Sequence, residues 1–459
     1  MNNDQSTESN QQIQSLKDFY DTNETQSYQF RYNALVQLKQ SIKDNESDII
    51  HALKQDLNKP EFEIYASELA VIYNEIDYTL KHLKRWLKAK KVATPLSLFY
   101  AKSYIIQESL GLVLIISPWN YPLQLALIPL IGAVAAGNVV VIKPSEYTPY
   151  INQVLKKIIS KSFVNKHVAV IEGDGATITP QLINTNSFEH VFFTGSTRVG
   201  KIIANLCSDK LIPYTLELGG KNPAIVSANC DLEVCAKRIV WAKFFNAGQT
   251  CIAPDYLLVE DSIKSDFIKL LQKYILKFYS NSDDYAKIIN KSRFEHLVNL
   301  IADLNIIHGG GHDLSRLFIE PTLVLIDNLD IPIMQEEIFG PILPIISYQQ
   351  ETDIDNIIKR NPYPLALYMF SNDKNFNSRI INQIKFGGGC INTALLHFAN
   401  YHLPFGGIRY SGIGKYHAKY TFDVFSHSKS ILDMSTKIDI STKYPLYTAF
   451  KLKLLKLFS

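Results

Sequence analysis

One cysteine, Cys251, lies near the end of the uncharged stretch FFNAGQTCIAP, which runs from Phe244 to Pro254. The preceding Gly-Gln-Thr lets the backbone approach the sulfur closely, and a thiolate placed there could act as a nucleophile that forms covalent acyl intermediates. The same cysteine could be an inert packing residue, because free cysteines in apolar surroundings usually behave as small hydrophobic side chains. Other motifs of the chain have to decide between these two roles.

A series of short motifs accompanies this cysteine along the chain. They are PWNYP (118–122), KPSE (143–146), FTGSTRVG (193–200), LELGGKNP (216–223), FNAGQTCIAPD (245–255), EEIFGP (336–341) and LPFGG (403–407). In this order and approximate spacing they resemble the aldehyde dehydrogenase superfamily, from about residue 30 to about residue 430. The runs GQTCIAPDY and QEEIFGPILP, the short N-terminus and the ending SHSKS look like class 3, the group of fatty and aromatic aldehyde dehydrogenases.

The resemblance implies oxidation of an aldehyde to a carboxylic acid. Cys251 would add to the carbonyl and give a thiohemiacetal, whose oxyanion needs preorganised donors; the family places the Asn120 amide and the Cys251 backbone N–H there. After hydride transfer to a nicotinamide, water must cleave the thioester, and Glu217 is the expected general base. A glutamate at the end of an apolar strand should have its pKa raised by burial, which suits a base near neutral pH.

The resemblance also implies how a cofactor is held, since no GxGxxG turn joins a strand to a helix. Lys143 and Glu146 are expected at the adenine ribose hydroxyls. The Gly195-Ser196 turn, at a helix N-terminus, is expected near the pyrophosphate, because backbone N–H groups and the helix dipole favour anions. The Glu146 carboxylate would repel a 2′-phosphate, so NAD is the expected cofactor, although class 3 members often accept NADP as well.

At the other end of the cofactor, the resemblance assigns Glu337 to the nicotinamide ribose, with Phe339 packing beside it. The remaining cofactor contacts that it implies are Trp119, Gly200 and Leu218. The substrate class that it implies is a long apolar aldehyde (fatty, or a polyene such as an apocarotenoid) or an aromatic one.

Alternatives remain open at this point. An acylating relative would pass the thioester to coenzyme A or act on an acyl phosphate, but such enzymes generally lack a base at the position of Glu217. A catalytically silent binding protein on the same fold would have no need of Cys251, Glu217 and Asn120 together. Locally, Asn120 could be a plain turn residue, and Glu217 could form an ion pair with Lys221 or Lys243.

Length, composition and charge limit the classes of protein to which this chain can belong. The 459 residues suit two domains, and 46% hydrophobic with 20% charged residues describes a packed globule. A net charge of +3 indicates no nucleic-acid partner. The five cysteines are scattered without a CxxC pair, which favours reduced thiols in the cytoplasm over a disulfide framework or a zinc site. The polar N-terminus MNNDQSTESNQQ lacks the pattern of a signal peptide.

An uncharged stretch from Ser109 to Ile142 has to be weighed against a membrane span, since about 20 apolar residues suffice to cross a bilayer. The pattern instead predicts a β-α-β unit of parallel strands: GLVLIIS, the helix LQLALIPLIGAVAAG, and NVVVIKPSE. Strands and helices continue to alternate through HVAVIEG, HVFFTGSTRVGKIIANLC, NPAIVS, YLLVEDS, ALYMFS and CINTA. The predicted fold class is α/β, an aldehyde dehydrogenase-like fold with two doubly wound domains and a small β oligomerisation element.

The first hundred residues read as helices whose role is packing. Leu69, Ile72, Ile76, Leu80, Leu83 and Leu87 form one helix face, Pro95 ends that run, and a strand follows from Ser103 to Ser109. The predicted cofactor domain, which includes the N-terminal helices, comprises residues 1–101 and 110–216, and the predicted catalytic domain comprises residues 217–395. An oligomerisation and bridging element is predicted at 102–109 and 396–440, and a tail at 441–459. Class 3 relatives pair through a strand-rich element, so a homodimer is expected, built on the strand at 103–109 and the chain after Ala418.

The tail YPLYTAFKLKLLKLFS, from Tyr444 to Ser459, reads as an imperfect amphipathic helix. Its apolar face would contain Leu446, Phe450, Leu454, Leu457 and Phe458, with Leu452 and Leu455 outside. It is too short to span a bilayer. Two roles stay open: an arm packed on the dimer, or a segment that rests on a membrane surface or caps the aldehyde tunnel.

Overall fold

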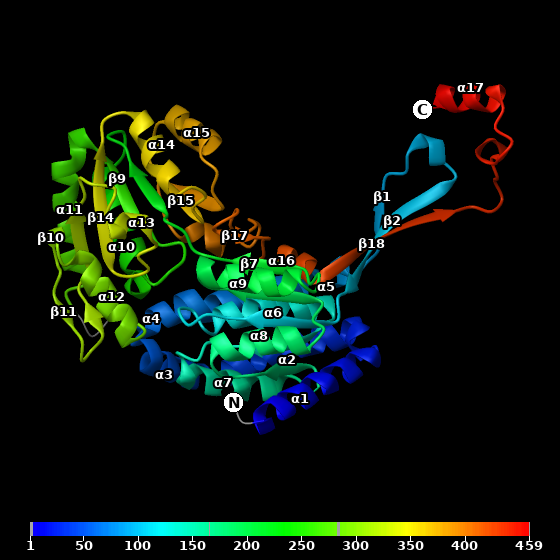
Figure 1. Cartoon of the computed structure of the whole chain (residues 1–459), viewed down its shortest axis with the longest axis horizontal. Helices are drawn as coiled ribbons and strands as arrows, with labels where there is room; N and C mark the ends of the chain where they lie inside the picture. The colour runs from blue at the N-terminus through cyan, green and yellow to red at the C-terminus, as the bar shows by residue number, and fades with distance from the viewer. Residues whose placement is uncertain (1–2, 165, 282–284, 459) are drawn as a thin grey trace.

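Two large sheets, each covered by helices, and one small projecting sheet organise the chain (Figure 1). The computed structural model describes residues 3–164, 166–281 and 285–458. The first large sheet has the strand order β17-β7-β6-β3-β4-β5, in which the five strands from β7 to β5 run parallel and β17 pairs antiparallel. Its strands are β3 (Leu112–Ile116), β4 (Val139–Lys143), β5 (Val168–Val170), β6 (His190–Thr194), β7 (Tyr214–Glu217) and β17 (Gly412–Ile413).

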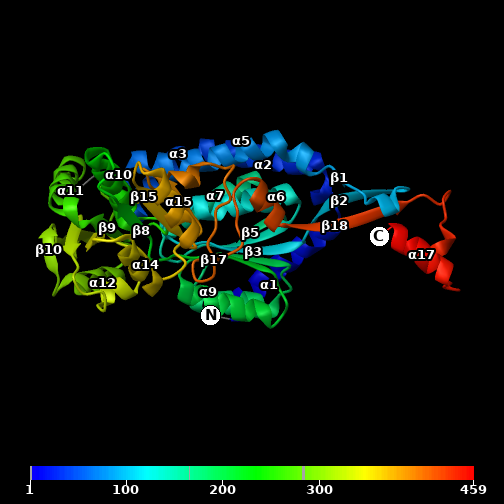
Figure 2. The same ribbon diagram turned by 90° about the horizontal axis from the view of Figure 1, so that it is seen from above.

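Helices cover both faces of the first sheet (Figure 2). Val113 and Ile115 pack into one apolar cluster, whereas their neighbours Leu112 and Leu114 pack into another, because alternate residues of a strand face opposite sides. The first side is covered by α6 (Gln124–Ala136) and α7 (Pro149–Ser162), and beyond them by α2 (Tyr28–Asp44), α3 (Glu46–Leu57) and α5 (Ala70–Trp86). The second side is covered by α1 (Asn3–Asp21) and α9 (Thr197–Ser208), and by α8 (Gly175–Thr185), whose apolar residues belong to the second cluster.

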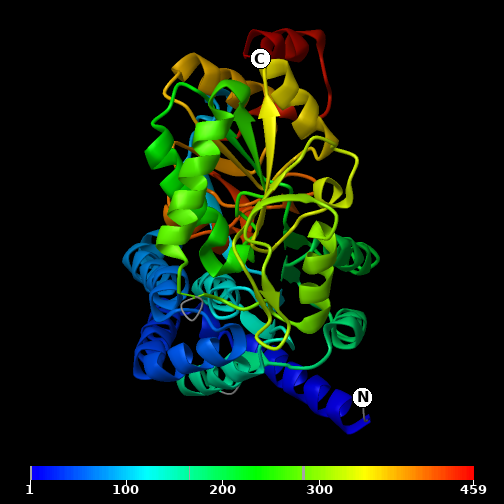
Figure 3. The same cartoon turned by 90° about the vertical axis from the view of Figure 1, so that its left-hand side faces the viewer.

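The second large sheet has the order β10-β13-β14-β9-β8-β15-β16, with β10 antiparallel at one edge. Its strands are β8 (Pro223–Val226), β9 (Tyr256–Glu260), β10 (Asn305–His308), β13 (Thr322–Leu325), β14 (Ile342–Tyr348), β15 (Ala366–Phe370) and β16 (Gly388–Ile391). Helices α10 (Leu232–Phe244) and α11 (Lys264–Phe278) lie on one face, and α12 (Lys291–Ile301) and α14 (Glu351–Arg360) on the other (Figures 2 and 3). The remaining elements include α13 (Pro332–Gln335), α15 (Lys374–Gln383), α16 (Lys419–Val424) and the pair β11 (His312–Asp313) and β12 (Phe318–Ile319).

The doubly wound α/β prediction is confirmed. The uncharged stretch folds as β3, α6 and β4, with β3 and β4 parallel as expected. Among the described residues, no helix combines the length and the apolarity that crossing a membrane requires. The prediction that Pro95 ends the preceding helix is wrong: α5 stops at Trp86, and the chain enters a short strand, β1 (Lys90–Val92), which pairs with β2.

The small sheet forms an arm that projects from the body (Figures 1 and 2). Strand β2 (Ala101–Ser109), predicted as a strand, lies between β1 and β18 (Ser426–Met434), and β18 pairs with it antiparallel along its whole length. Helix α17 (Ala449–Phe458) lies beyond the arm, away from both large sheets (Figure 1). Leu446 precedes this helix, with φ of 64°, so it does not belong to the predicted helical face. The Phe458 side chain lies outside the described residues.

Candidate active site

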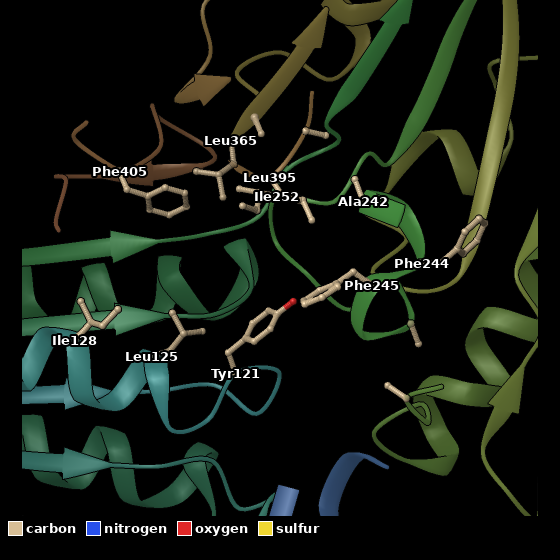
Figure 4. Packing of buried hydrophobic residues seen from close by; sticks show 14 of the residues in the cluster. Tyr121, Leu125, Ile128, Ala242, Phe244, Phe245, Ile252, Leu365, Leu395 and Phe405 are labelled. Atoms are coloured by element: carbon tan, nitrogen blue, oxygen red, sulfur yellow. The ribbon is translucent and has the colours of Figure 1, made fainter. Parts of the chain in front are cut away.

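The carboxyl ends of strands β6 and β7 open onto a cavity of about 450 Å³. Such edges are where open α/β sheets usually bind ligands. Thr194 ends β6, Glu217 ends β7, and both line the cavity together with Cys251. Figure 4 shows several apolar residues of this wall, among them Tyr121, Phe245, Ile252, Leu365, Leu395 and Phe405, on loops and helix ends between the sheets.

The loop that carries Cys251 leaves α10 through a distorted turn, Phe245–Gly248. Asn246 and Ala247 both have φ of 53°, in the left-handed region, and Gly248 follows with φ of 71°. A Cβ atom at Gly248 would lie 2.3 Å from the Gly340 carbonyl oxygen, so only glycine fits this approach of the EEIFGP motif. Strained backbone of this kind persists only where its surroundings hold it, and it is common at functional sites.

Hydrogen bonds from distant parts of the chain hold this loop. The Asn246 N–H donates to Glu63 Oε2 (2.9 Å), from the N-terminal helices. The Asn222 side chain, in the LELGGKNP motif, donates to the Cys251 carbonyl oxygen (2.8 Å). Cys251 is therefore fixed by both the N-terminal helices and the segment that connects the two sheets.

Cys251 is half-buried in the cavity wall. Burial raises the pKa of its thiol, and the neighbouring Glu337 and Glu217 carboxyl groups raise that pKa further, against the opposing effect of the Cys251 and Ile252 N–H groups. The resting side chain is therefore a thiol, and its proton must leave before the sulfur can act as a nucleophile.

Glu217 is 3% exposed, and neither of its carboxyl oxygens has a hydrogen-bond partner in the part of the chain that the structure describes. Burial raises the pKa of this carboxyl well above its usual range. The alternative ion pair with Lys221 is not formed, because Lys221 Nζ contacts Asp255 Oδ2 at 2.5 Å instead. Once it has lost its own proton, a buried carboxyl that has no partner among the described residues can accept a proton in this cavity.

Asn120 lies against the cysteine loop. Its side-chain amide donates to the Gln249 carbonyl oxygen (3.1 Å), two residues before Cys251. The main-chain carbonyl oxygen of Asn120 accepts hydrogen bonds from Lys59 Nζ (3.1 Å) and from the Asn246 side chain (3.1 Å). The structure thus brings the PWNYP loop and the cysteine loop together, and the Asn120 amide is bonded to backbone at their junction.

The residues expected at the adenosine end of a cofactor form a connected cluster. Lys143, which ends β4, contacts Glu146 at 2.7 Å, and Glu146 Oε1 accepts from the Gly175 N–H (3.1 Å). Partial burial opposes ionisation of Glu146, but the bond from Lys143 and backbone N–H groups lower its pKa on balance. A Cβ atom at Gly175 would lie 3.2 Å from Lys143 Nζ, so this glycine leaves the surface of the pair open.

The expected pyrophosphate turn lies next to strand β7, which ends at Glu217. The Gly195 N–H donates to the Glu217 carbonyl oxygen (3.0 Å), and Ser196 caps α9 by accepting from the Val199 N–H (3.4 Å). Gly200, one turn into α9, packs against the Leu218 side chain, where a Cβ atom would come within 2.6 Å. The N-terminus of α9 is thereby held close to Glu217.

Glu337 lies in an adjoining cleft of about 250 Å³ with Gly219, Gly220 and Lys221. Burial and the nearby Asp255 raise the pKa of Glu337 to about 8, although the Gly220 N–H opposes the shift. A Cβ atom at Gly219 would lie 2.1 Å from the Glu337 carboxyl, which explains a glycine at that position. Two residues after Glu337, the Phe339 ring meets the Trp119 ring edge to face, with centroids 5.5 Å apart.

Comparison with known proteins bears directly on this arrangement. Residues 1–431 match the sequence profile of the aldehyde dehydrogenase family. The chain belongs to this family.

Several relatives align with the aldehyde dehydrogenase over nearly its whole length. It is 47% identical over 454 residues to the 4,4'-diaponeurosporen-aldehyde dehydrogenase of Staphylococcus aureus, covering 98% of each chain. It is 39% identical over 439 residues to the dimeric NADP-preferring aldehyde dehydrogenase of Mus musculus, covering 94% of this chain and 96% of the relative. A solved structure of the substrate-bound state of Staphylococcus aureus AldH superposes with a TM-score of 0.95 at 46% identity, over 98% of this chain and 99% of that one. The protein is therefore an oxidoreductase that oxidises an aldehyde to a carboxylic acid.

The site of this aldehyde dehydrogenase includes two motif residues to which the sequence analysis gave no role. The Tyr121 and Thr250 hydroxyls share a 2.5 Å hydrogen bond, and both residues line the cavity. Tyr121 belongs to PWNYP and Thr250 to the cysteine motif, so their positions within motifs were the available signal.

The expectation that the first hundred residues serve only in packing is wrong. Phe62, Ala66, Ser67 and Val71 line the cavity of the aldehyde dehydrogenase. They lie on α4 (Glu61–Ile64), on the π-helical turn Tyr65–Leu69 and at the start of α5. The helical stripe indicated a buried face correctly, but a buried face and a cavity wall have the same apolar pattern.

Proposed function

We propose that the enzyme oxidises a long apolar aldehyde, with NAD as hydride acceptor and Cys251 as nucleophile. The observation that carries the proposal is that Cys251 and the unpartnered, buried Glu217 carboxyl line one largely apolar cavity. The Cys251 thiol loses its proton to water, and the thiolate adds to the aldehyde carbon. The Cys251 backbone N–H and the Asn120 amide stabilise the oxyanion, after Asn120 exchanges its Gln249 partner for the substrate.

Loss of a hydride from this tetrahedral adduct to the acceptor would leave a thioester on Cys251, which water then cleaves. Glu217 removes a proton from the attacking water, and the collapse of the tetrahedral intermediate releases the carboxylic acid and regenerates the thiolate. The raised pKa of Glu217 makes it a stronger base than an exposed glutamate once it has lost its proton. The apolar cavity keeps water away from other positions around the sulfur.

The chain has groups suited to NAD along the edge of the first sheet. Lys143 and Glu146 would bind the adenine ribose hydroxyls, the N-terminus of α9 at Gly195 and Ser196 would face the pyrophosphate, and Glu337 would hold the nicotinamide ribose. The open cleft beside Glu337 and the N-cap at Ser196 support this assignment.

Trp119, Gly200, Leu218 and Phe339 complete the proposed contacts. When bound, NAD supplies the hydride acceptor, and the Glu146 carboxylate disfavours the 2′-phosphate of NADP.

The substrate class follows from the cavity and from the relatives. Most of the cavity wall is aromatic or aliphatic. Phe62, Trp241 and Phe245 also line a second hollow of about 390 Å³, which includes the exposed Phe278. Apolar surface therefore continues past the first cavity, as a long chain requires. The name of the Staphylococcus aureus relative indicates a polyene aldehyde, and we propose an apocarotenoid or fatty aldehyde here.

We assign the cofactor domain to residues 1–101 and 110–216, the catalytic domain to 217–395, and oligomerisation and bridging to 102–109 and 396–440. Strand β17, within the last segment, joins the first sheet, which supports a bridging role. Strand β18 is an edge of the projecting sheet, with Leu432 48% exposed, and such edges pair readily with another chain. These features support a homodimer, and the name of the dimeric mouse relative agrees with it.

We further propose that the enzyme is cytoplasmic and contacts membranes peripherally through residues 441–459. The five cysteines are free thiols, as suits a reducing compartment. Phe450, Leu452 and Leu457 on α17 are each more than half exposed, beside Lys453 and Lys456. Apolar side chains interleaved with lysines are typical of interfacial helices.

The test of the proposed function is NADH formation with a panel of short, aromatic, fatty and polyene aldehydes. We expect the highest kcat/KM with long apolar members. Cys251→Ala should abolish activity and leave NAD affinity unchanged, because the variant loses the nucleophile but no proposed cofactor contact. Normal turnover in Cys251→Ala would contradict the mechanism, and a preference for short polar aldehydes would contradict the substrate class.

A further inference from the structure

Beneath the PWNYP loop lies an ion pair with no solvent exposure. Lys59 Nζ contacts Glu68 Oε1 at 2.9 Å, and both side chains are 0% exposed. Lys59 follows α3, and Glu68 lies on the π-helical turn before α5. Neither residue belongs to the motifs of the nucleophile, the base or the cofactor.

The remaining contacts of the pair go to one short segment. Lys59 Nζ donates to the Asn120 carbonyl oxygen (3.1 Å) and lies 4.3 Å from the centroid of the Tyr121 ring. Glu68 Oε2 accepts from the N–H groups of Leu123 (3.0 Å) and Gln124 (3.0 Å), where α6 begins. One carboxylate therefore caps the helix that follows the loop, while the lysine that it holds binds the carbonyl of Asn120.

The same main-chain carbonyl of Asn120 is also hydrogen-bonded to the cysteine loop. It accepts a second bond from the Asn246 side chain (3.1 Å), which also donates to the Gln249 carbonyl oxygen (3.2 Å). The Asn120 amide donates to that same Gln249 oxygen. The position of Asn120 relative to the cysteine loop is thus fixed through its main chain by Lys59 on one side and by Asn246 on the other.

Burying two charges is unfavourable unless each has good partners, and removing one partner leaves an uncompensated charge. Here each charged group makes its additional hydrogen bonds to the segment that carries Asn120. A pair that served only to join helices α3 and α5 would have no reason to concentrate its contacts on that segment.

We infer that Lys59, held in place by Glu68, is a positioning residue for aldehyde oxidation: it fixes the main chain at Asn120 so that the Asn120 amide can reach the oxyanion. The inference rests on the proposed function, in which Asn120 is an oxyanion donor. Small displacements of such donors have large effects, because a misplacement of about 1 Å can reduce a rate about 100-fold.

The experiment compares Lys59→Met, Asn120→Ala and the double variant Lys59→Met/Asn120→Ala by rapid-mixing measurement of single-turnover NADH formation with hexanal. We expect Lys59→Met to reduce the rate about 10- to 100-fold, with unchanged NAD affinity. In the Asn120→Ala background the same substitution should cause little further loss, because the donor that Lys59 positions is already gone.

Lys157→Met is the control, since Lys157 forms an ion pair with Asp48 at the surface and should leave the rate unchanged. If Lys59→Met does not fold, Lys59→Met/Glu68→Gln replaces it, because this change removes both charges together. A wild-type rate in the folded variant overturns the inference, as do losses that multiply in the double variant, since these would indicate a general structural role. If Asn120→Ala itself reacts at the wild-type rate, the donor role in the proposed function fails separately, and a positioning role through Asn120 fails with it.

Discussion

The carboxyl group of Glu337 lies so close to Gly219 that a Cβ atom there would stand 2.1 Å from Glu337 Oε2. Glu337 is on the loop before β14, and Gly219 follows β7, so this contact joins segments that belong to different sheets. The second glycine, Gly220, donates its N–H to the same carboxyl. The LELGG motif therefore provides the space and a donor for Glu337, in addition to Glu217, the proposed base.

Gly219→Ala is predicted to displace Glu337 while the protein remains folded. If Glu337 holds the nicotinamide ribose, NAD affinity should fall by about tenfold, since a buried polar group that loses its hydrogen-bond partner costs roughly 1–3 kcal/mol. Titration calorimetry or fluorescence with NAD gives the affinity directly. The matched control is Gly311→Ala, where the added Cβ atom would approach the surface carboxylate of Glu320 (2.6 Å), which can move aside. Equal NAD affinity in both variants would contradict the assignment of Glu337.

Glu217→Gln is predicted to separate the two halves of the reaction. If Glu217 acts mainly on the attacking water, the variant should release a burst of about one NADH per active site and then turn over slowly. Its steady-state kcat should fall by about 100-fold or more, the usual contribution of a general base. Rapid mixing measures both phases. A uniformly slow reaction without a burst would instead assign Glu217 to removal of the thiol proton.

The sequence predicts the reacting groups better than it predicts what holds them. Cys251, Glu217 and Asn120 occur within contiguous motifs, and the alternation of strands and helices gives the two doubly wound sheets. Lys59 and Glu63 have no such signal, because their bonds to Asn120 and Asn246 span 61 and 183 residues along the chain. A lysine or glutamate among helical residues reads as solvated surface unless the fold is known.

The residues at which helices begin and end could also not be predicted from the sequence. Pro95 was expected to end a helix, but α5 already stops at Trp86, and strand β1, which begins at Lys90, pairs with β2. Leu446 fits the apolar face of a helix by spacing alone, yet α17 starts only at Ala449. Periodicity indicates that a helix exists, whereas tertiary pairing and local φ angles determine where it begins.

Glu63 is predicted to make stability depend on pH. Burial raises the pKa of this carboxyl from 4.5 to about 7, although the Asn246 N–H and Lys59 oppose the shift. Between these values the folded protein keeps a proton that the unfolded chain has released, so the free energy of unfolding falls as pH rises through this window. The fall is about 3 kcal/mol at most for one such group, and it is complete above about pH 7.

Glu63→Gln cannot titrate and should not show this part of the pH dependence. Urea unfolding of both proteins from pH 4.5 to 8 should give a difference in unfolding free energy that changes in favour of the variant as pH rises. Because glutamine cannot accept from the Asn246 N–H as strongly as a carboxylate, activity should be measured in parallel. Parallel stability profiles for the two proteins would show that Glu63 does not titrate in this range.

The final prediction concerns the tail beyond Lys443, which includes α17. In the described part of the chain, no residue after Tyr416 lines the aldehyde cavity, and α17 lies beyond the projecting sheet, so the tail does not cap the cavity of its own chain. Its exposed apolar residues therefore need another surface: a membrane or a second copy. Leu446, Phe450 and Leu457 are 87%, 71% and 77% exposed. Burial of one such side chain contributes roughly 1.5–3 kcal/mol, so several together suffice for reversible membrane binding.

Deletion of residues 444–459 should accordingly reduce co-sedimentation with anionic liposomes and raise KM for long-chain aldehydes presented in those liposomes. KM for benzaldehyde or hexanal should change little, because these substrates reach Cys251 from water. The variant Phe450→Ser/Leu457→Ser removes two apolar side chains and keeps the lysines. If hydrophobic insertion holds the tail on the membrane, this variant should show the same loss of co-sedimentation and the same rise in KM as the deletion. If charge attraction alone holds the tail, co-sedimentation of the variant with liposomes should be unchanged. Sedimentation velocity distinguishes the other surface: if the deletion converts a dimer into a monomer and affects all substrates equally, the tail is a dimer arm, and its membrane role is excluded.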